Sequence, residues 1–168
     1  MKRRIIALAL CLMLAMSAAL AETAAGTKVF QLGTSVYTVE IPDSFIEGER
    51  TEEDIADDQV AYMHSPDTLL DFDVYQFGKE GFPEKLADFA KEEAEEYNAT
   101  EVVTEGNING IDAAWYRAVE TYDEAEYTTL TYALEDGDQY VEIVFWLDGE
   151  NAEQEAQAII NTLTFVTR

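Results

Sequence analysis

Cysteine is almost missing from this sequence. Its one cysteine, Cys11, lies inside an apolar run near the start of the chain, and no cysteine follows it. The sequence after that run therefore offers no disulfide, no thiolate nucleophile and no thiolate ligand for a metal. A cysteine-free chain suits an oxidising compartment without using its chemistry.

Histidine is equally scarce. His64 is the only histidine, so the paired histidine ligands of a transition-metal site cannot be assembled. A catalytic triad also lacks material, because none of Ser35, Ser44 and Ser65 lies in a G-x-S-x-G motif. Ser65 is adjacent to His64, and neighbours on a strand point to opposite faces. The sequence therefore predicts no catalytic residue, and no cofactor apart from the calcium considered below.

Positive charge is the third deficiency. The chain has 10 Lys and Arg against 35 Asp and Glu, which gives a formal net charge of -25. Three of the cations and none of the acids lie in the first 21 residues, so the remaining chain carries seven cations, 35 acids and a net charge of -28. Nucleic acids and anionic membranes are bound through clustered Lys and Arg. We therefore expect neither as a partner, and the charge favours a cationic one.

The first 21 residues have the pattern of a secretory signal peptide. Three cations stand at positions 2–4, an apolar run follows, and Ala19 and Ala21 put small side chains at positions -3 and -1 before Glu22. The apolar run is short for a membrane span. Leu10, just before Cys11, does not fit a lipoprotein signal. We expect cleavage before Glu22 and export from a bacterial cell.

The rest of the sequence predicts one α+β domain. After the signal peptide at 1–21, we expect a flexible leader at 22–28 and a single domain at 29–168, since no linker composition interrupts it. Alternating apolar residues predict a hairpin over 29–41, strands over 59–64 and 70–77, and a four-strand meander from 102 to 147. Residues 46–58 are weakly patterned and indicate a loop or one helical turn. Together these form an antiparallel sheet of about six to eight strands.

Two amphipathic helices complete the expected domain. Pro83 suits the first turn of a helix, which then carries apolar residues on one face at Leu86, Phe89, Ala90, Ala94 and Tyr97. A second stripe runs through Ala152, Ala156, Ile159, Ile160 and Leu163, with Asp148 or Asn151 as its cap. We expect Phe165 and Val166 to fold back onto the core.

Three elements of the sequence resemble a known family. They are Tyr37-x-Val39-x-Ile41-Pro42-x-x-Phe45, Ile108-Asn109-Gly110-Ile111-x-Ala113-x-x-Tyr116, and Ile159-Ile160-x-Thr162-Leu163-x-Phe165. Together with the helix between the first two, they are similar to PsbP-like domains over residues 29–165. These are packing and turn residues, so they carry no chemistry. The resemblance implies an antiparallel sheet with helices on its faces.

The same resemblance implies a non-enzymatic role. PsbP-like domains include exported bacterial proteins of unknown function, an extrinsic photosystem subunit and a Ran-binding nuclear import factor. These look like accessory or binding proteins, and the family supplies no catalytic motif to transfer to a position here. The photosystem role transfers poorly, because the chain has no plastid-type targeting segment.

Calcium is the metal that the sequence leaves open, because it accepts oxygen ligands alone. Asp71 and Asp73 lie two residues apart on an expected strand, and Asp136 and Asp138 flank Gly137. The alternative is a solvated acidic surface, since close acidic pairs arise by chance in so acidic a chain. The Asp-Gly pair is also explained by a hairpin turn.

Tyrosine is concentrated in the meander. The tyrosines of the expected meander are Tyr116, Tyr122, Tyr127, Tyr132 and Tyr140. If they are exposed on one face, they form a binding surface for a cationic or amphipathic partner, because tyrosine suits interfaces. The alternative is ordinary strand propensity.

A pair of carboxyl groups could also hydrolyse glycosides, with Trp115, Tyr116 and Trp146 as sugar-stacking surfaces. Strand alternation favours the sheet core for both tryptophans instead. Our first hypothesis is thus a secreted, non-enzymatic binding or accessory domain with an unidentified partner outside the membrane. A calcium-responsive module and a small hydrolase are the alternatives, and adaptation of the charge to salt or solubility needs no ligand at all.

Overall fold

The computed structural model describes residues 26–122 and 124–166. The expected signal peptide and most of the expected leader lie outside these residues. Within them, no helix is long and apolar enough to cross a membrane. The first strand begins at Thr27, two residues before the expected start of the domain.

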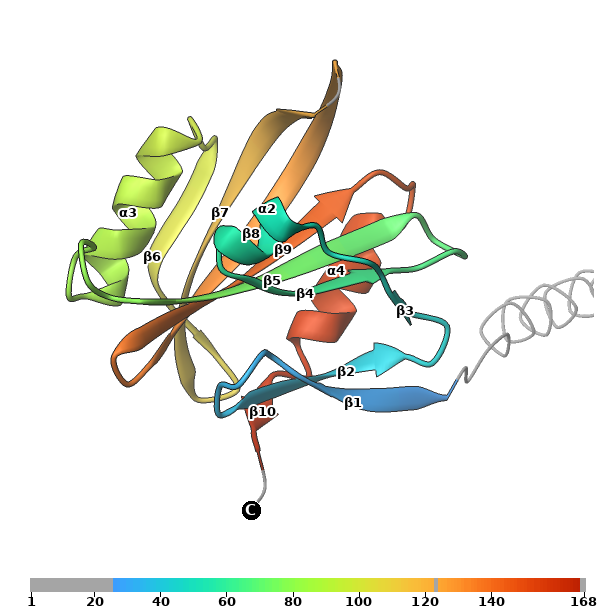
Figure 1. Ribbon diagram of the computed structural model, residues 1–168, viewed down its shortest axis with the longest axis horizontal. Coiled ribbons are helices and arrows are strands. Elements are labelled where there is room, and N and C mark those ends of the chain that lie inside the picture. Colours follow the sequence, from blue (N-terminus) through green and yellow to red (C-terminus); the bar gives the residue numbers. More distant parts are fainter. Residues whose placement is uncertain (1–25, 123, 167–168) are drawn as a thin grey trace, which may run out of the picture.

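A seven-stranded antiparallel sheet dominates the molecule (Figure 1). Its strand order is β3-β4-β5-β9-β8-β7-β6. The strands are β3 (Ile46–Glu47), β4 (Gln59–His64), β5 (Leu70–Gly78), β6 (Glu101–Ile108), β7 (Ile111–Tyr122), β8 (Ala125–Asp136) and β9 (Gln139–Leu147). The last four strands form the expected meander, and its final strand pairs with β5 along nine residue pairs from Leu70↔Leu147 to Gly78↔Gln139. This pairing brings two distant segments of the chain together at the centre of the sheet.

The opening hairpin belongs to a second, smaller sheet. Strands β1 (Thr27–Gln31) and β2 (Tyr37–Pro42) pair with each other, and β10 (Thr164–Phe165) adds to β2. The α+β prediction is therefore confirmed, with the strands divided between two sheets. Phe165 does not fold into the core as expected: it contacts the ring of Tyr37 but is 55% exposed.

One face of the large sheet carries the main hydrophobic core. Strand alternation points Phe72, Ile143 and Phe145 to this face, where all three are almost fully buried. Helix α4 (Ala152–Ile160) and the small sheet cover it, and the buried side chains of α4 are those of the predicted stripe. The helix begins after Asn151, one of its two expected caps, without a side-chain capping bond.

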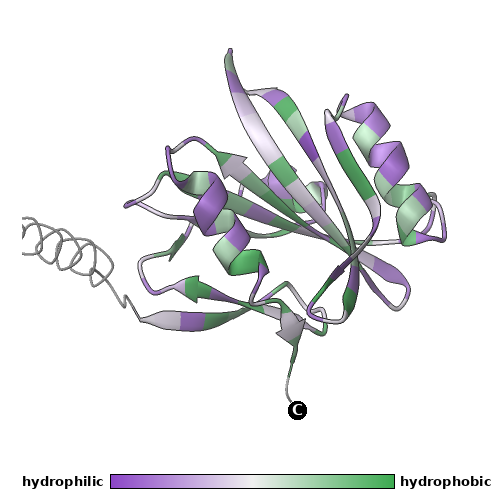
Figure 2. Ribbon diagram, turned by 180° about the vertical axis from the view of Figure 1, so that it is seen from behind, coloured by the Kyte–Doolittle hydropathy of each residue, from purple (hydrophilic) through white to green (hydrophobic). Residues whose placement is uncertain are grey.

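The other face is covered only in part. Helix α3 (Leu86–Glu96) packs on β6, β7 and β8, and the short helix α2 (Glu52–Ala56) contacts β4. In Figure 1 α2 lies in front of the strands and α4 behind them, and the reversed view in Figure 2 exchanges their order. Helix α3 begins three residues after Pro83, so the prediction that Pro83 lies in its first turn is wrong. The Pro83 carbonyl instead accepts a 2.6 Å hydrogen bond from the Tyr140 hydroxyl.

Hairpin turns fix the register of the meander. Asn109 and Gly110 both have positive φ angles, 53° and 86°, as a two-residue type I′ turn requires. Gly137 has a φ of 64° in the turn between β8 and β9. The Asn-Gly and Asp-Gly predictions are therefore confirmed. Register then decides which side chains share each face.

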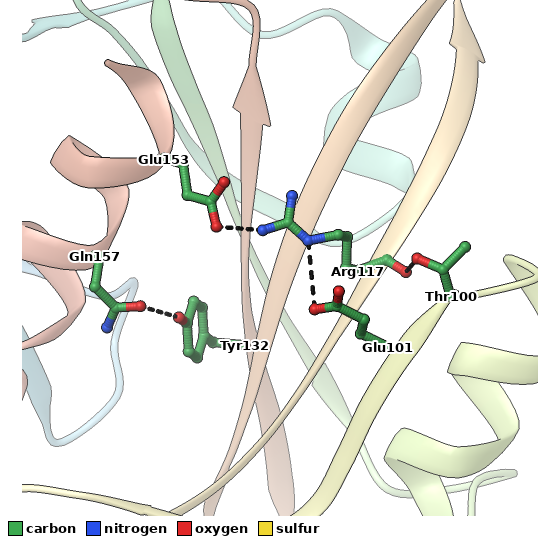
Figure 3. A network of polar contacts seen from close by, with 6 residues as sticks. All are labelled: Thr100, Glu101, Arg117, Tyr132, Glu153 and Gln157. Carbon is green, nitrogen blue, oxygen red and sulfur yellow. Dashed lines mark hydrogen bonds and ion pairs between the residues drawn. The ribbon is translucent and has the colours of Figure 1, made fainter. Parts of the chain in front are cut away.

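A polar network joins the meander to α4 on the core side (Figure 3). The guanidinium of Arg117 forms ion pairs with Glu101 on β6 and Glu153 on α4. The Tyr132 hydroxyl and the Gln157 side chain are hydrogen-bonded at 3.3 Å nearby. Arg117 is therefore committed to holding elements together and does not serve the opposite face.

Candidate functional site

The incompletely covered face of the large sheet presents polar and aromatic side chains in register. β5 contributes Asp71, Asp73 and Tyr75, and β9 contributes Glu142, Val144 and Trp146. In the pairing of these strands, Asp71 lies opposite Trp146 and Tyr75 lies opposite Glu142. Helix α3 covers one side of this face and α2 the other, so the middle is open. The candidate site lies in this gap.

The first cleft opens beside α2 and has a volume of about 650 Å³. Its aromatic walls are formed by Tyr62, Tyr75, Tyr127 and Trp146. Five carboxyl groups also line it: Glu49, Asp54, Asp71, Asp73 and Asp148. Aromatic faces and carboxylates together form a surface suited to a ligand with both apolar and cationic parts.

Asp73 lies at the floor of this cleft. Its Oδ1 accepts a 2.8 Å hydrogen bond from the Gln59 amide, and its Oδ2 accepts a 2.6 Å hydrogen bond from the indole N–H of Trp146. Burial raises the pKa of Asp73 to about 6, against the opposing effect of the Trp146 hydrogen bond, and the nearby Asp71 carboxylate raises it further. Asp73 therefore positions both the amide and the indole ring.

Gln59 leaves one polar atom unpaired at the same place. Its side chain is only 8% exposed, and its Oε1 has no hydrogen-bond partner among the described residues. A buried polar atom without a partner costs about 1–3 kcal/mol. Beside it, Asp71 accepts a 2.9 Å hydrogen bond from the Tyr62 hydroxyl. An unpaired acceptor thus lies buried beneath the cleft surface, next to the hydrogen-bonded carboxyl groups of Asp71 and Asp73.

A second cleft, of about 470 Å³, lies between the end of α2 and α3. It is also lined by five carboxyl groups: Asp57, Asp58, Glu93, Glu120 and Glu142. Glu142 is only 7% exposed, and its Oε1 has no hydrogen-bond partner in the described part of the chain. Burial raises its pKa to about 8, with repulsion from Glu93 and Glu120 adding to the shift.

Three tyrosines surround Glu142. Burial raises the pKa of Tyr75, Tyr97 and Tyr116, and neighbouring carboxylates raise each further. For Tyr97 the pKa reaches about 12. All three hydroxyls therefore stay protonated at neutral pH, and the cleft walls remain uncharged between the carboxyl groups.

The two clefts are neighbours. Tyr75 and Trp146 line both of them, so these rings form a shared wall. No lysine or arginine lines either cleft. We call the two clefts together the acidic trough. The strand pairing of β5 with β9 creates it, because that pairing sets Asp73 diagonally across from Glu142.

The two candidate calcium pairs lie in different parts of the structure. Asp71 and Asp73 share one face in the first cleft, as expected from alternation. Asp136 and Asp138 stand at the far end of β8 and β9, about 23 Å away by strand rise. Asp136 accepts a hydrogen bond from the backbone N–H of Val36 instead. No group of three His, Cys, Asp or Glu residues is placed to hold a metal in residues 26–122 and 124–166.

The predicted tyrosine surface is wrong in its main part. Tyr116, Tyr132 and Tyr140 are 3%, 4% and 0% exposed. Tyr132 lies on the core face, and Tyr140 stacks on Phe89 of α3 at 4.1 Å. Tyr127 alone among the five lines the first cleft, half-buried. The side chain of Tyr122 lies outside the described residues. Alternation on β8 sends Tyr127 and Tyr132 to opposite faces.

The tryptophans divide in the same way. Trp115 packs against the main core, as predicted, whereas Trp146 is a half-buried wall of the trough. His64 lines the first cleft, near Tyr62. Asp71 and Asp73 project side by side from one strand, whereas a glycosidase pair flanks the bond that it cleaves. Both Asp73 oxygens also hold structural donors, so the geometry offers no free proton donor there.

Sequence reasoning did not identify Gln59, Tyr75, Glu120 or Glu142 as site residues. One signal was present: Glu142 stands in phase with Tyr140, Val144 and Trp146 on an otherwise apolar strand. A carboxyl group in such a row is expensive to bury, which often marks a functional position. The partners of Glu142 come from other strands and from α3, so the sequence did not group them.

No family model matches the sequence, and no curated protein matches it. Solved structures do. Cyanobacterial PsbP from Synechocystis is 7% identical with a TM-score of 0.60, covering 86% of this chain and 95% of that one. LpqN of Mycobacterium tuberculosis, described as involved in cell envelope biogenesis, is 11% identical with a TM-score of 0.51 over 87% and 94%.

A structure from Bacteroides thetaiotaomicron is 20% identical with a TM-score of 0.56. The match covers 84% of this chain and 49% of that one, so this chain spans about half of that protein. At these identities the likeness concerns the fold alone. It confirms the PsbP-like fold that the three sequence elements predicted.

Proposed function

We propose that this chain of PsbP-like fold is an exported, non-enzymatic binding domain whose ligand occupies the first cleft. One observation carries the proposal: the Gln59 side chain lines an open cleft of about 650 Å³, and its buried Oε1 has no partner among the described residues. Such a cleft, with aromatic walls and few fixed polar groups, is the usual form of a small-molecule site.

Export is part of the same proposal. Positions 1–21 have the composition of a signal peptide, and the chain after them is free of cysteine. LpqN, with a similar fold, is described as involved in cell envelope biogenesis. A binding role at or beyond the cell envelope accords with these features. It also accords with the side-by-side arrangement of Asp71 and Asp73, which does not resemble a hydrolytic pair.

The indole resonances provide a direct test. Trp115 and Trp146 are the only tryptophans, and only Trp146 lines the cleft. We expect a collection of fragments, including amines, carboxylates, neutral aromatics and sugars, to contain members that shift the Trp146 indole N–H signal but not that of Trp115. If no fragment of any class shifts Trp146, the cleft is not a ligand site and the proposal fails.

A further inference from the structure

The acidic trough lacks any cation of its own. Its ten lining carboxyl groups come from α2, α3, several strands and the segments that connect them, without a lysine or arginine among the lining residues. The ion pairs of Lys79, Lys91 and Arg117 all lie elsewhere in the described chain. Arg50 lies beside the first cleft and donates to the Gln59 carbonyl. The trough therefore has more negative charge than its own residues compensate.

One buried side chain in each cleft has an oxygen without a hydrogen-bond partner among the described residues. Glu142 Oε1 in the second cleft and Gln59 Oε1 in the first are both hydrogen-bond acceptors, and both lack a partner in the described residues. Each side chain is more than nine-tenths buried. The buried hydroxyl of Ser65, which lines the first cleft, also lacks a partner in the described residues, and it can both donate and accept. A ligand with an ammonium group in each cleft would donate to Gln59 in the first and, in the second, to the Glu142 carboxylate that its charge favours.

The walls between these points are apolar and aromatic. Tyr75 and Trp146 form the shared wall, and Leu69, which lines the first cleft, is 60% exposed. Leu69 also has a φ of 58°, an unusual conformation for leucine, which costs free energy to hold at the cleft. Ring faces attract ammonium groups and pack on methylene chains. A calcium ion would gain nothing from such walls.

We propose that the acidic trough binds a linear aliphatic polyamine, with one ammonium group in each cleft and the connecting methylene chain across Tyr75 and Trp146. This inference rests on the proposed function of the first cleft. The register supports it, because diagonal neighbours on paired strands, such as Asp73 and Glu142, lie about 7–8 Å apart. That span suits two ammonium groups joined by a short methylene chain.

Proton release on binding provides a second, independent sign that the ligand occupies the trough. Glu142 is mainly protonated at neutral pH in the free protein, because its pKa is about 8. An ammonium group beside it favours the carboxylate, so binding should release a proton. The groups facing Glu142 are Tyr75 and Asp73 on β5, Glu120 and Tyr116 on β7, Glu93 on α3, and Tyr97 just after α3.

Calorimetric titration of the purified protein tests the proposal. The probes are spermidine, butanediamine, the uncharged butanediol and calcium, in about 0.15 M salt to screen diffuse attraction. We expect saturable one-to-one binding of spermidine, weaker binding of butanediamine, and no binding of the diol or calcium. At pH 7 the heat should change with the buffer, in proportion to the proton released.

Matched variants distinguish specific binding in the acidic trough from general attraction to the negative charge of the chain. Glu142→Gln and Glu120→Gln should each weaken spermidine binding at least tenfold. Asp138→Asn removes the same charge at an exposed turn outside the trough and should leave binding unchanged. Equal effects of all three variants, equal binding of calcium, or no heat with spermidine would each overturn the proposal. If neutral or anionic fragments still shift Trp146, the first cleft remains a binding site for another ligand class.

Discussion

The indole N–H of Trp146 donates a 2.6 Å hydrogen bond to Oδ2 of Asp73 across the β5–β9 pair. The other Asp73 oxygen is bound by Gln59, so one buried carboxyl group orients a ring on β9 and an amide on β4. The two strands are neighbours only because the chain returns through the meander. This relationship gives the first cleft its floor and its wall.

Ionisation of Asp73 should be visible in Trp146. Because burial raises the Asp73 pKa to about 6, the carboxylate forms as the pH rises through that value. A charge 2.6 Å from the indole nitrogen changes its emission, so we expect a fluorescence titration with a midpoint near pH 6. The measurement belongs in a His64→Gln background, which removes the only histidine. Asp73→Asn should abolish the titration, and its persistence in that variant would contradict the assignment.

Glu142 should make the free protein less stable as the pH rises. Its folded pKa, about 8, lies above the ordinary value of 4.5, so the folded state holds a proton that the unfolded state has lost. Stability from this group is present below about pH 4.5 and is lost progressively up to about pH 8. The change should be a few kcal/mol at most. Denaturant unfolding at several pH values measures it.

Glu142→Gln should flatten this part of the pH profile, since the amide does not titrate. Glu105→Gln, at an exposed position of β6, is the matched control and should keep the profile of the unaltered protein. An unchanged slope in Glu142→Gln would mean that Glu142 is not the group responsible. Spermidine, if it binds as proposed, should reduce the loss of stability at high pH.

Gly106→Ala should destabilise the domain through the contact with Trp115. A methyl group at Gly106 would overlap the Trp115 ring and lie 2.9 Å from the Ala113 carbonyl oxygen. The register of β6 shifts between Val103 and Gly106, so the ring packs on exposed backbone there. We expect a loss of about 1–3 kcal/mol in the free energy of unfolding. Gly78→Ala, where nothing lies within 4 Å, should cost far less.

Salt should stabilise the domain. The chain after position 21 has a net charge of -28, and the acids of the trough have no cation among its lining residues. Screening weakens this repulsion, and most of its effect is reached once the Debye length falls to about 8 Å, near 0.15 M. We expect the melting temperature to rise by several degrees up to that point. A flat response would show that the charges are already compensated locally.

Export should remove the first 21 residues. Expression of the full sequence in a bacterium should release a protein whose intact mass corresponds to a start at Glu22. Ala21→Leu places a large side chain at position -1 and should block processing. Ala18→Leu, at position -4, should be processed normally. Recovery of uncleaved protein from the unaltered sequence would contradict the prediction.

Local pattern explains what the sequence predicted well. The stripe through Ala156 and Ile160 and the Asn109–Gly110 turn depend on neighbours within a few residues, and the structure has both. Pro83 was less informative, because proline is compatible with the residues just before a helix as well as with its first turn. The prediction of an exposed tyrosine surface was wrong for a similar reason. Strand propensity does not indicate which face of the sheet a side chain occupies.

The sequence by itself determined the fold class, the acidic character of the chain after position 21 and the absence of cysteine chemistry there. These follow from composition and from periodicity, which act over short distances along the chain. Only the tertiary structure decided that Asp73, Trp146 and Glu142 would meet. Their meeting depends on the pairing of β5 with β9 and on two helices that leave the middle of one sheet face uncovered, and no short stretch of sequence encodes either.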